Sequence, residues 1–449
     1  MAKRSAQQLR RTAAQMHALA AVRDDIGSQD SSTGRGYLRE FTQHFRDYDS
    51  VLSPDELQRR ISTASTVLIG DYHALPACQR FAAEVFEASA RQRKVVLGVE
   101  AVLARDQRIL DAWWRREITE DELRRRLRFD REWGYQWASF YTLISTARDC
   151  ADGLYALDCM PREDLRRIRS RDRHAAVKIA EIRQRHPDAA VFVLFGESHL
   201  APQHLPRSIQ ELLPSENLLI VLQNVDALYW RAVAQQASTV SIGKDAVCVF
   251  NSSPLEKYES YRLCLDGWNA AADDLPDFAP AIYNLIFSLA KSLGFRLDSP
   301  RNGTQPKYLT DLLPEVVTLD EYAGNLDSKL EDKTCAYLAD ANLFVIKEFQ
   351  MTDAAEECAR FLYSACRGMV RLSAAAQPIE DALARFGSRL LCPEFEAKDQ
   401  TPRLGDSLYQ AYLGGKIPLP RLRRVFLTKQ ESREQARKTL ARLADLTTA

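Results

Sequence analysis

The sequence predicts an α/β domain with a mostly parallel sheet and flanking helices, followed by a mainly helical C-terminal domain. Between residues 65 and 226, short β-branched apolar runs alternate with amphipathic stretches of helical length. This alternation is typical of βαβ units and a parallel sheet. After residue 240 the strand-like runs become short and helix-length stretches dominate. We therefore expect an N-terminal helical segment at 1–61, the α/β domain at 62–268 and the helical domain at 269–449.

The N-terminal segment is expected to contain helices separated by a loop. Residues 1–26 and 37–62 have helical character, whereas residues 27–36 are rich in Gly and Ser, which is a composition typical of loops. Ser53 and Pro54 match the N-cap residue and first-turn proline with which helices commonly begin.

Five apolar runs are predicted to be the strands of the α/β domain. They are residues 66–70, 95–100, 154–158, 191–196 and 218–223. Because they are nearly continuous in apolar residues, they are typical of strands buried on both faces. The stretches between them are predicted helices: 76–93, 104–151, 162–186 and 205–213.

The C-terminal part is predicted to be mainly helical. Two short strand-like runs come first, at 240–243 and 246–250. Predicted helices follow at 254–265, 280–294, about 308–314, 319–350, 352–387 and 429–447.

Three of the predicted strands end in Gly followed within three residues by His or a carboxylate. These strand ends are Gly70-Asp71-Tyr72-His73, Gly98-Val99-Glu100 and Gly196-Glu197-Ser198-His199. Ligands bind outside the carboxyl ends of parallel strands, so we expect His73, Glu100 and His199 to meet at one edge of the sheet. The run at 154–158 ends in Asp158, which is a weaker candidate because its strand is the least apolar.

Imidazole and carboxylate groups at this edge allow two kinds of chemistry. They are ligands for a metal such as zinc, and they also serve as general base and acid on a water molecule. Asp71 and Glu197 share loops with the two histidines. They either take part directly or orient the imidazoles, as neighbouring carboxylates commonly do.

These strand ends resemble the ChaN-like domain, which shares a superfamily with the Tiki proteases, the TraB-like proteins and the erythromycin esterases. Members carry two Gly-x-x-His motifs and an intervening glutamate, and the resemblance covers about residues 62–230. Two further segments are similar to the family pattern: Arg171-Asp172-Arg173-His174-Ala175-Ala176 and Trp133 to Tyr141 with Arg148. Asp71 stands where many members carry Glu.

The resemblance implies two functions. The first is a hydrolase, either metal-dependent with His73, Glu100 and His199 as ligands, or metal-free with a His/Glu general base. The alternative is a haem- or iron-binding protein without turnover, with Tyr72 as an axial ligand. In either case the resemblance implies a small-molecule or haem ligand, and Arg171 would meet an anionic group. We expect an enzyme, with a divalent metal or haem as the cofactors to test.

Further candidates carry less weight. Tyr135 and Tyr141 are alternative axial ligands, and His174 and His204 are auxiliary imidazoles. All seven histidines precede residue 205, so any imidazole chemistry belongs to the first half of the chain.

Composition excludes several other classes. The 61 Lys and Arg residues balance 61 Asp and Glu residues, so no global field attracts nucleic acid. No phosphate-binding glycine loop follows any predicted strand, and no run reaches the ~18 apolar residues of a membrane span. Nine cysteines without a CxxC pair fit a reducing compartment. The basic N-terminus lacks the apolar core of a secretion signal, so we expect a cytoplasmic protein.

Overall fold

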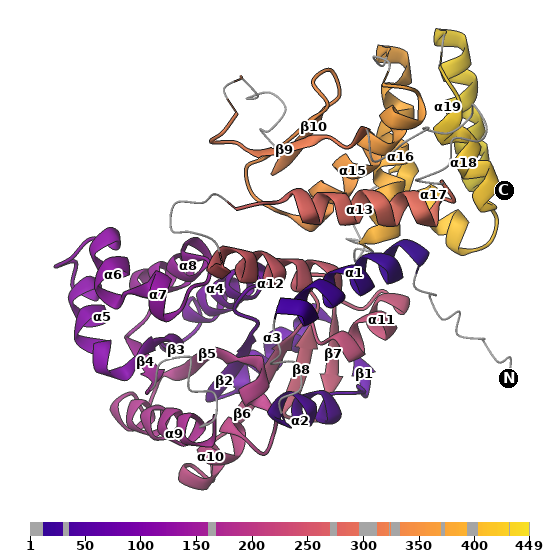
Figure 1. The fold of residues 1–449 in the computed structure, drawn as a ribbon. Coiled ribbons are helices and arrows are strands. Elements are labelled where there is room, and N and C mark those ends of the chain that lie inside the picture. The colour runs from indigo at the N-terminus through magenta and orange to yellow at the C-terminus, as the bar shows by residue number, and fades with distance from the viewer. Residues whose placement is uncertain are drawn as a thin grey trace, which may run out of the picture. The chain divides into compact units, whose positions relative to one another are not determined.

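The structure, a computed structural model, divides the chain into two compact units. It describes residues 12–29, 36–159, 168–269, 276–295, 312–322, 324, 333–369, 373–392, 403–430 and 432–448 (Figure 1). One unit is formed by residues 30–264, and the other by residues 1–29 together with 265–449. The expected N-terminal segment at 1–61 is thus shared between the two units.

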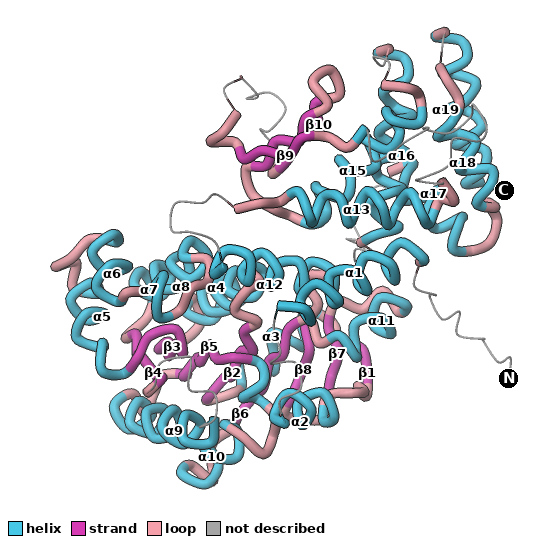
Figure 2. Tube along the Cα trace, viewed as in Figure 1, coloured by secondary structure: helices cyan, strands magenta, loops and turns pink. Residues whose placement is uncertain are grey.

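The unit of residues 30–264 is built on an eight-stranded sheet (Figure 2). In spatial order its strands are β1 (Ser50–Val51), β7 (Thr239–Ile242), β8 (Ala246–Val249), β6 (Leu218–Gln223), β2 (Thr66–Asp71), β5 (Ala190–Gly196), β3 (Val95–Leu103) and β4 (Leu154–Asp158). From β8 to β4 neighbouring strands are parallel. At the other edge, β7 pairs antiparallel with both β8 and β1. The predicted fold class is confirmed, with each predicted strand within three residues of its observed bounds.

Helices connect and cover these strands. They are α2 (Gly36–His44), α3 (Pro54–Thr63), α4 (Pro76–Ala90), η2 (Ala104–Asp106), α5 (Gln107–Trp114), α6 (Glu120–Leu127), α7 (Phe129–Glu132), α8 (Trp137–Cys150), α9 (Ile168–Arg185), η4 (Glu197–Leu200), α10 (Leu205–Leu212), α11 (Asp226–Ala234) and α12 (Pro254–Asn269). The predicted stretch 104–151 is broken into several helices. Arg116, Arg128 and Gly134 have positive φ angles of 61°, 53° and 72°, which a continuous helix does not contain.

The start of α3 follows its predicted sequence signal. The Ser53 side chain accepts a hydrogen bond from the Glu56 N–H, and Pro54 occupies the first helical turn, where its missing N–H leaves no donor unsatisfied. The predicted continuous helix over 37–62 is wrong, however, because the short edge strand β1 separates α2 from α3.

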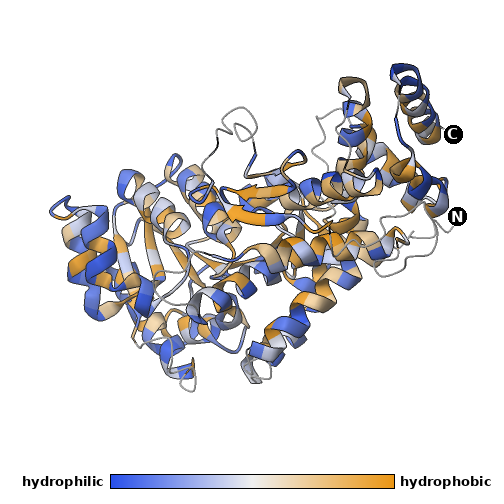
Figure 3. Ribbon diagram, turned by 45° about the horizontal axis from the view of Figure 1, so that its top comes forward, coloured by the Kyte–Doolittle hydropathy of each residue, from blue (hydrophilic) through white to orange (hydrophobic). Residues whose placement is uncertain are grey.

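The central strands lie between two helical layers. Every residue of β2, β5 and β6 is buried, as the apolar runs predict. In Figure 1, α4 and α8 cover one face of the sheet, and α9 and α10 cover the other. Phe86 of α4 packs edge-on against Phe192 of β5 with ring centroids 5.4 Å apart, and burial of one such side chain contributes roughly 1.5–3 kcal/mol. Figure 3 shows this apolar centre and the polar outer faces of the helices.

The other unit packs helices beside a small sheet. Its elements are α1 (Ala13–Gln29), α13 (Ala279–Ser292), β9 (Glu315–Thr318), β10 (Cys335–Leu338), β11 (Leu343–Ile346), α15 (Met351–Cys366), η6 (Ala374–Ala376), α16 (Gln377–Leu391), α17 (Leu404–Leu413), α18 (Leu419–Leu427) and α19 (Arg433–Thr448). The helical character is confirmed, and α1 packs against α13 and α16. No helix among the described residues is long and apolar enough to cross a membrane.

Two predictions for this unit are wrong. Where a helix was expected at 319–350, β10 and β11 pair antiparallel and β9 pairs parallel with β11. The turn between β10 and β11 contains Asn342 with a φ of 49°, which Asn tolerates better than most residues. The predicted helix at 352–387 is interrupted where Gly368 and Met369 have φ angles of 79° and 59°. Most of the expected helix at 308–314 lies outside the described residues.

Candidate functional site

The carboxyl ends of β2, β5 and β3 bring the three predicted side chains together. These strands are neighbours in the order β2-β5-β3, and Asp71 is in register with Gly196. The Nε2 atom of His73 lies 3.8 Å from Oε2 of Glu100. The Nε2 atom of His199 lies 3.8 Å from Oε1 of the same carboxylate. Glu100 is thus flanked by one imidazole on each oxygen.

Glu100 is a buried carboxylate held by two donors. Only 4% of the residue is exposed, and it accepts hydrogen bonds from Arg171 Nη2 at 2.6 Å and from the Gly196 N–H at 2.5 Å. Burial alone raises the pKa of Glu100, but the charges of His73, Arg171 and His199 outweigh it and lower the pKa overall. Glu100 therefore stays ionised.

Gly196 is required by the close approach of the two side chains. A Cβ atom at this position would lie 3.1 Å from Oε2 of Glu100 and 3.2 Å from Nε2 of His73. Because both atoms belong to groups held in place by other contacts, they have little freedom to move away. Glycine permits this close approach because it has no Cβ atom.

Arg171 does not present a free guanidinium to a ligand. From α9, its Nε donates to Asp158 Oδ1 at 3.0 Å, and its Nη2 reaches both Asp158 Oδ2 and Glu100 Oε1 at 2.6 Å. The side chain is 2% exposed. We therefore regard Arg171 as a positioning residue for Glu100 rather than the predicted contact for an anionic group. Asp158, the weaker strand-end candidate, is its second partner.

His73 is anchored by the aspartate of its own motif. Its Nδ1 lies 2.8 Å from Asp71 Oδ2, and Gln79 Nε2 donates to the other oxygen of Asp71. The His73 side chain is 19% exposed, and its ring packs against Trp133 and Tyr135 with centroids 4.4 and 5.4 Å apart. An ionised Asp71 accepts the Nδ1–H, which leaves the Nε2 lone pair free to accept a proton.

His199 is anchored by an aspartate from another element. Its Nδ1 lies 2.5 Å from Oδ1 of Asp172 on α9, and its side chain is only 4% exposed. His204, one of the auxiliary candidates, lies behind Asp172 with Nδ1 3.5 Å from Oδ2. Asp172 belongs to the Arg-Asp segment that resembles the family pattern, and the sequence alone predicts no role for it. Successive residues of α9 thus reach Glu100 and His199. The other auxiliary candidate, His174, is partly buried on the same helix.

Glu197 binds a lysine side chain rather than either imidazole. Both of its carboxylate oxygens bind Nζ of Lys257, at 2.9 and 3.1 Å, and the same Nζ donates to the Asn224 carbonyl. Burial raises the pKa of Glu197 although Lys257 lowers it. Lys257 lies on α12, 60 residues further along the chain, and no local sequence pattern identifies this partner.

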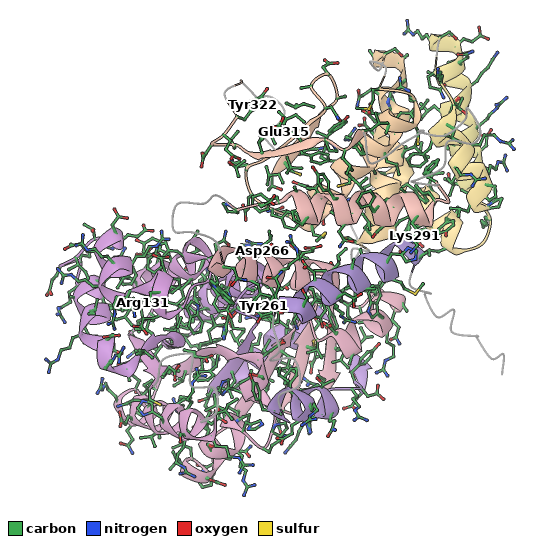
Figure 4. The ribbon with its side chains drawn as sticks, viewed as in Figure 1. Arg131, Tyr261, Asp266, Lys291, Glu315 and Tyr322 are labelled. Carbon is green, nitrogen blue, oxygen red and sulfur yellow. The ribbon has the colours of Figure 1, made fainter. Side chains whose placement is uncertain are left out.

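Tyr72 is poorly suited to bind iron as a phenolate. Nζ of Lys257 lies 4.5 Å from the centre of its ring, and Tyr261, labelled in Figure 4, packs against it at 6.2 Å. Burial raises the pKa of Tyr72 well above its ordinary value of 10.0. Of the other tyrosine candidates, Tyr141 packs on Trp113 and Trp137, whereas Tyr135 contacts His73.

A small cavity lies beside His73. Its lining includes both polar and aromatic side chains: Asp71, His73, Gln79, Val99, Glu100, Ala101, Trp133, Tyr135, Gln136, Phe140 and Leu194. Its volume of about 10 Å³ is close to the ~10–15 Å³ that one water molecule requires. The cavity therefore has room for about one water beside His73.

Groups of His, Cys, Asp and Glu side chains hold metal ions such as zinc in proteins. Among the described residues, no group of three or more His, Cys, Asp and Glu side chains that could hold a metal ion is found. His73 and His199 face different oxygens of Glu100, and the Arg171 guanidinium already places a positive charge against that carboxylate. The predicted metal-ligand set His73, Glu100 and His199 is therefore not such a group in the described part of the chain.

The fold and the site define a parallel α/β protein with a His/Glu centre at its strand ends. Residues 57–191 match the model of a family described as "Haem-binding uptake, Tiki superfamily, ChaN". The predicted resemblance to the ChaN-like domain is confirmed for this part of the chain. The chain is also similar to a solved structure of ChaN from Campylobacter jejuni, at 13% identity and a TM-score of 0.30, over 39% of this chain and 87% of the other. The search of curated proteins found no significant match.

Proposed function

We propose that the α/β unit is a hydrolase in which His73 activates a water molecule as a general base. The observation that carries this proposal is the Asp71–His73 pair beside a cavity of one-water size. An aspartate that binds Nδ1–H fixes the tautomer in which Nε2 accepts a proton, as in the Ser-His-Asp triad. His73 thereby takes the role of base on water rather than on a serine.

Glu100 supports this step electrostatically. When Nε2 of His73 takes a proton from water, the ring becomes an imidazolium 3.8 Å from the ionised Oε2 of Glu100. A buried carboxylate at that distance stabilises the positive charge as it forms, because screening is weak away from bulk water. Arg171 and the Gly196 N–H keep Glu100 ionised and in place. A positioned general base contributes about 10²–10⁴-fold to a rate.

The aromatic wall indicates where a substrate binds. Trp133 and Tyr135 contact the His73 ring and line the cavity. Aromatic side chains bind apolar parts of ligands over large contact areas. We therefore expect a substrate with an apolar group next to the bond that is hydrolysed, and the resemblance favours esters and peptides.

The experiment compares turnover by the full chain and by two variants. Aryl esters and quenched fluorescent peptides are the substrates, and His73→Ala is compared with His44→Ala, which removes an exposed histidine of α2. We expect His73→Ala to lose roughly 10²–10⁴-fold of the activity and His44→Ala to retain it. Full activity in His73→Ala would contradict the proposal.

Haem binding is the second candidate function, and the family description supports it. The specific observation is that Nδ1 of His73 is bound to the Asp71 carboxylate. Nε2 is then the ring nitrogen that would bind the haem iron. A carboxylate behind a histidine raises the basicity of the nitrogen that ligates a metal. Because the cavity accommodates about one water, haem would have to displace Trp133 and Tyr135.

Haem titration distinguishes this function from hydrolysis. Under the haem hypothesis, the full chain develops a Soret band that His73→Ala loses and Tyr72→Phe keeps. A Soret band that is unchanged in His73→Ala would contradict ligation by this residue. Turnover without a Soret band would leave the hydrolase as the function.

A further inference from the structure

Behind His199 lies a buried pair of polar side chains that the general-base step does not use. Asp172 and His204 are 1% and 4% exposed. Oδ2 of Asp172 and both ring nitrogens of His204 have no hydrogen-bond partner within normal geometry. Buried polar atoms without partners are rare in native proteins and call for an explanation.

These groups continue a line of alternating bases and acids from Glu100 to the surface. Oε1 of Glu100 lies 3.8 Å from Nε2 of His199, and Nδ1 of His199 lies 2.5 Å from Oδ1 of Asp172. Oδ2 of Asp172 lies 3.5 Å from Nδ1 of His204. Nε2 of His204 lies 3.2 Å from Oε2 of Glu40.

The outer end of the line is open to solvent. The side chain of Glu40, on α2, is 45% exposed, and α2 packs against η4, which carries His199. Gln203 donates a hydrogen bond to the Glu40 carboxylate at 3.0 Å. This hydrogen bond, together with the charges of His204 and Arg169, lowers the pKa of Glu40. Glu40 is thus an ionised acceptor that exchanges protons with water.

We propose that His199, Asp172, His204 and Glu40 form a proton relay between the Glu100 centre and solvent. This role rests on the proposed acid–base function of the site, but the relay is measurable without turnover. It gives the two strand-end histidines different tasks: His73 meets the reacting water, and His199 exchanges protons with the surface.

Each transfer in the relay moves one proton between named atoms. His199 accepts a proton at Nε2 from the side of Glu100 and releases its Nδ1 proton to Asp172. The carboxyl group of Asp172 then turns about its Cβ–Cγ bond and passes this proton to Nδ1 of His204, which releases its Nε2 proton to Glu40 and thus to water. The 3.8 Å gap between Glu100 and His199 and the 3.5 Å gap between Asp172 and His204 must both shorten to hydrogen-bond length at the moment of transfer. The same steps in reverse carry a proton from water to Nδ1 of His199, so the relay exchanges protons in both directions.

Exchange of the His199 Nδ1 proton with water tests the relay. In the full chain labelled with ¹⁵N-histidine, NMR saturation transfer measures this rate, and a His199→Gln sample assigns the signal. We expect Glu40→Gln and His204→Gln to slow the exchange by about tenfold or more, because the buried proton then leaves only through local opening. Glu40 is exposed, so Glu40→Gln is the variant that retains the fold most surely.

The matched control is Glu211→Gln. Glu211 lies on α10 in an exposed ion pair with Arg207, so this variant removes a surface carboxylate away from the relay, and exchange should remain at the wild-type rate. Equal exchange in the wild type and Glu40→Gln would overturn the relay. His73→Ala separates the two proposals, because it should abolish turnover while leaving exchange at His199 unchanged. Slowed exchange in His73→Ala would also contradict the relay, since His73 is not a member of it.

Discussion

The two Gly-x-x-His strand ends have the same sequence pattern but different surroundings. In each, Nδ1 is bound by an aspartate and Nε2 lies 3.8 Å from Glu100. The His73 side chain is 19% exposed and faces aromatic rings beside a cavity, whereas His199 is 4% exposed and packs edge-on against Phe195. The comparison teaches that a repeated motif supplies one imidazole beside a cavity and one that is enclosed by the protein.

The largest expected contrast is between His73→Ala and His199→Ala. His73→Ala should remove about 10²–10⁴-fold of the activity and destabilise the protein less than His199→Ala, because Asp71 keeps the hydrogen bond that Gln79 donates to it. His199→Ala should lower the free energy of unfolding by about 3–5 kcal/mol, because Asp172 becomes a buried carboxylate without its closest partner. Turnover assays and urea unfolding measure the two effects.

One outcome for His199→Ala would contradict the different roles of the two histidines. If His199→Ala kept wild-type stability and lost all activity while folded, His199 would be the reacting imidazole. A double variant, His199→Ala with Asp172→Ala, serves as the control. It should recover part of the stability, because the unpaired carboxylate is removed with its partner.

Variants of Arg171 test whether its ion pairs with Glu100 and Asp158 hold Glu100 in place. Arg171→Met should destabilise the protein by about 3–5 kcal/mol, because Glu100 and Asp158 are then left as neighbouring buried carboxylates. Arg171→Lys keeps the charge but lacks the forked geometry, so it should lie between the wild type and Arg171→Met. Thermal unfolding of the three proteins checks this order. If Arg171→Met were as stable as the wild type, the proposed positioning role would be lost.

Glu197 and Lys257 provide a comparison outside the two histidine pairs. Lys257→Met should destabilise the unit by about 1–3 kcal/mol, because Glu197 loses its bound cation. The double variant with Glu197→Gln should recover part of this loss and retain activity if Glu197 does not orient an imidazole. A double-mutant cycle in urea, with turnover assays on each protein, measures both. Complete inactivity of the folded double variant would restore Glu197 as a catalytic candidate.

The smallest expected effect is that Glu100 and Glu197 change the stability of the protein in opposite directions as the pH falls. Burial raises the pKa of Glu100, but the charges of His73, Arg171 and His199 lower it below 4.5 overall. For Glu197, burial raises the pKa above 4.5 although the charge of Lys257 lowers it. The stabilisation from ionised Glu100 is complete above pH 4.5 and is lost as the pH falls through the folded-state pKa. Ionised Glu197 is instead unfavourable at neutral pH, and this penalty is relieved as the pH falls toward 4.5.

Glutamine variants measure this difference. As the pH falls, the stability gap between the wild type and Glu100→Gln should shrink, and the wild type should gain relative to Glu197→Gln. Urea unfolding between pH 7 and pH 3 gives both trends. Parallel trends in the two variants would contradict the assigned directions of the pKa shifts.

The sheet was predictable because its strands carry a strong local signal. Runs such as Ala190–Gly196 are apolar throughout, and parallel connection places their ends at one edge. The three-stranded sheet of the other unit was missed because Cys335–Leu338 and Leu343–Ile346 are runs of four residues. Runs this short do not separate a strand from a buried helical turn.

The centre of the site was predictable, but its partners were only partly so. His73, Glu100 and His199 follow strands, and Asp71 is two residues from His73. Asp172 and Lys257 reach the site from helices, 27 and 60 residues from their partners His199 and Glu197. Contacts of that kind depend on how helices pack on the sheet, which the local sequence pattern does not specify.

The most direct test of the central claim is the rate at which diethyl pyrocarbonate modifies each histidine in the native full chain. Peptide mass mapping over time gives separate rates, and exposed His44 provides the reference. Because Asp71 holds Nδ1–H and leaves Nε2 nucleophilic, His73 should react as fast as His44 despite its 19% exposure, while His199 stays unmodified. If His199 reacted as fast as His73, or if His73 reacted much more slowly than His44, the account would be contradicted.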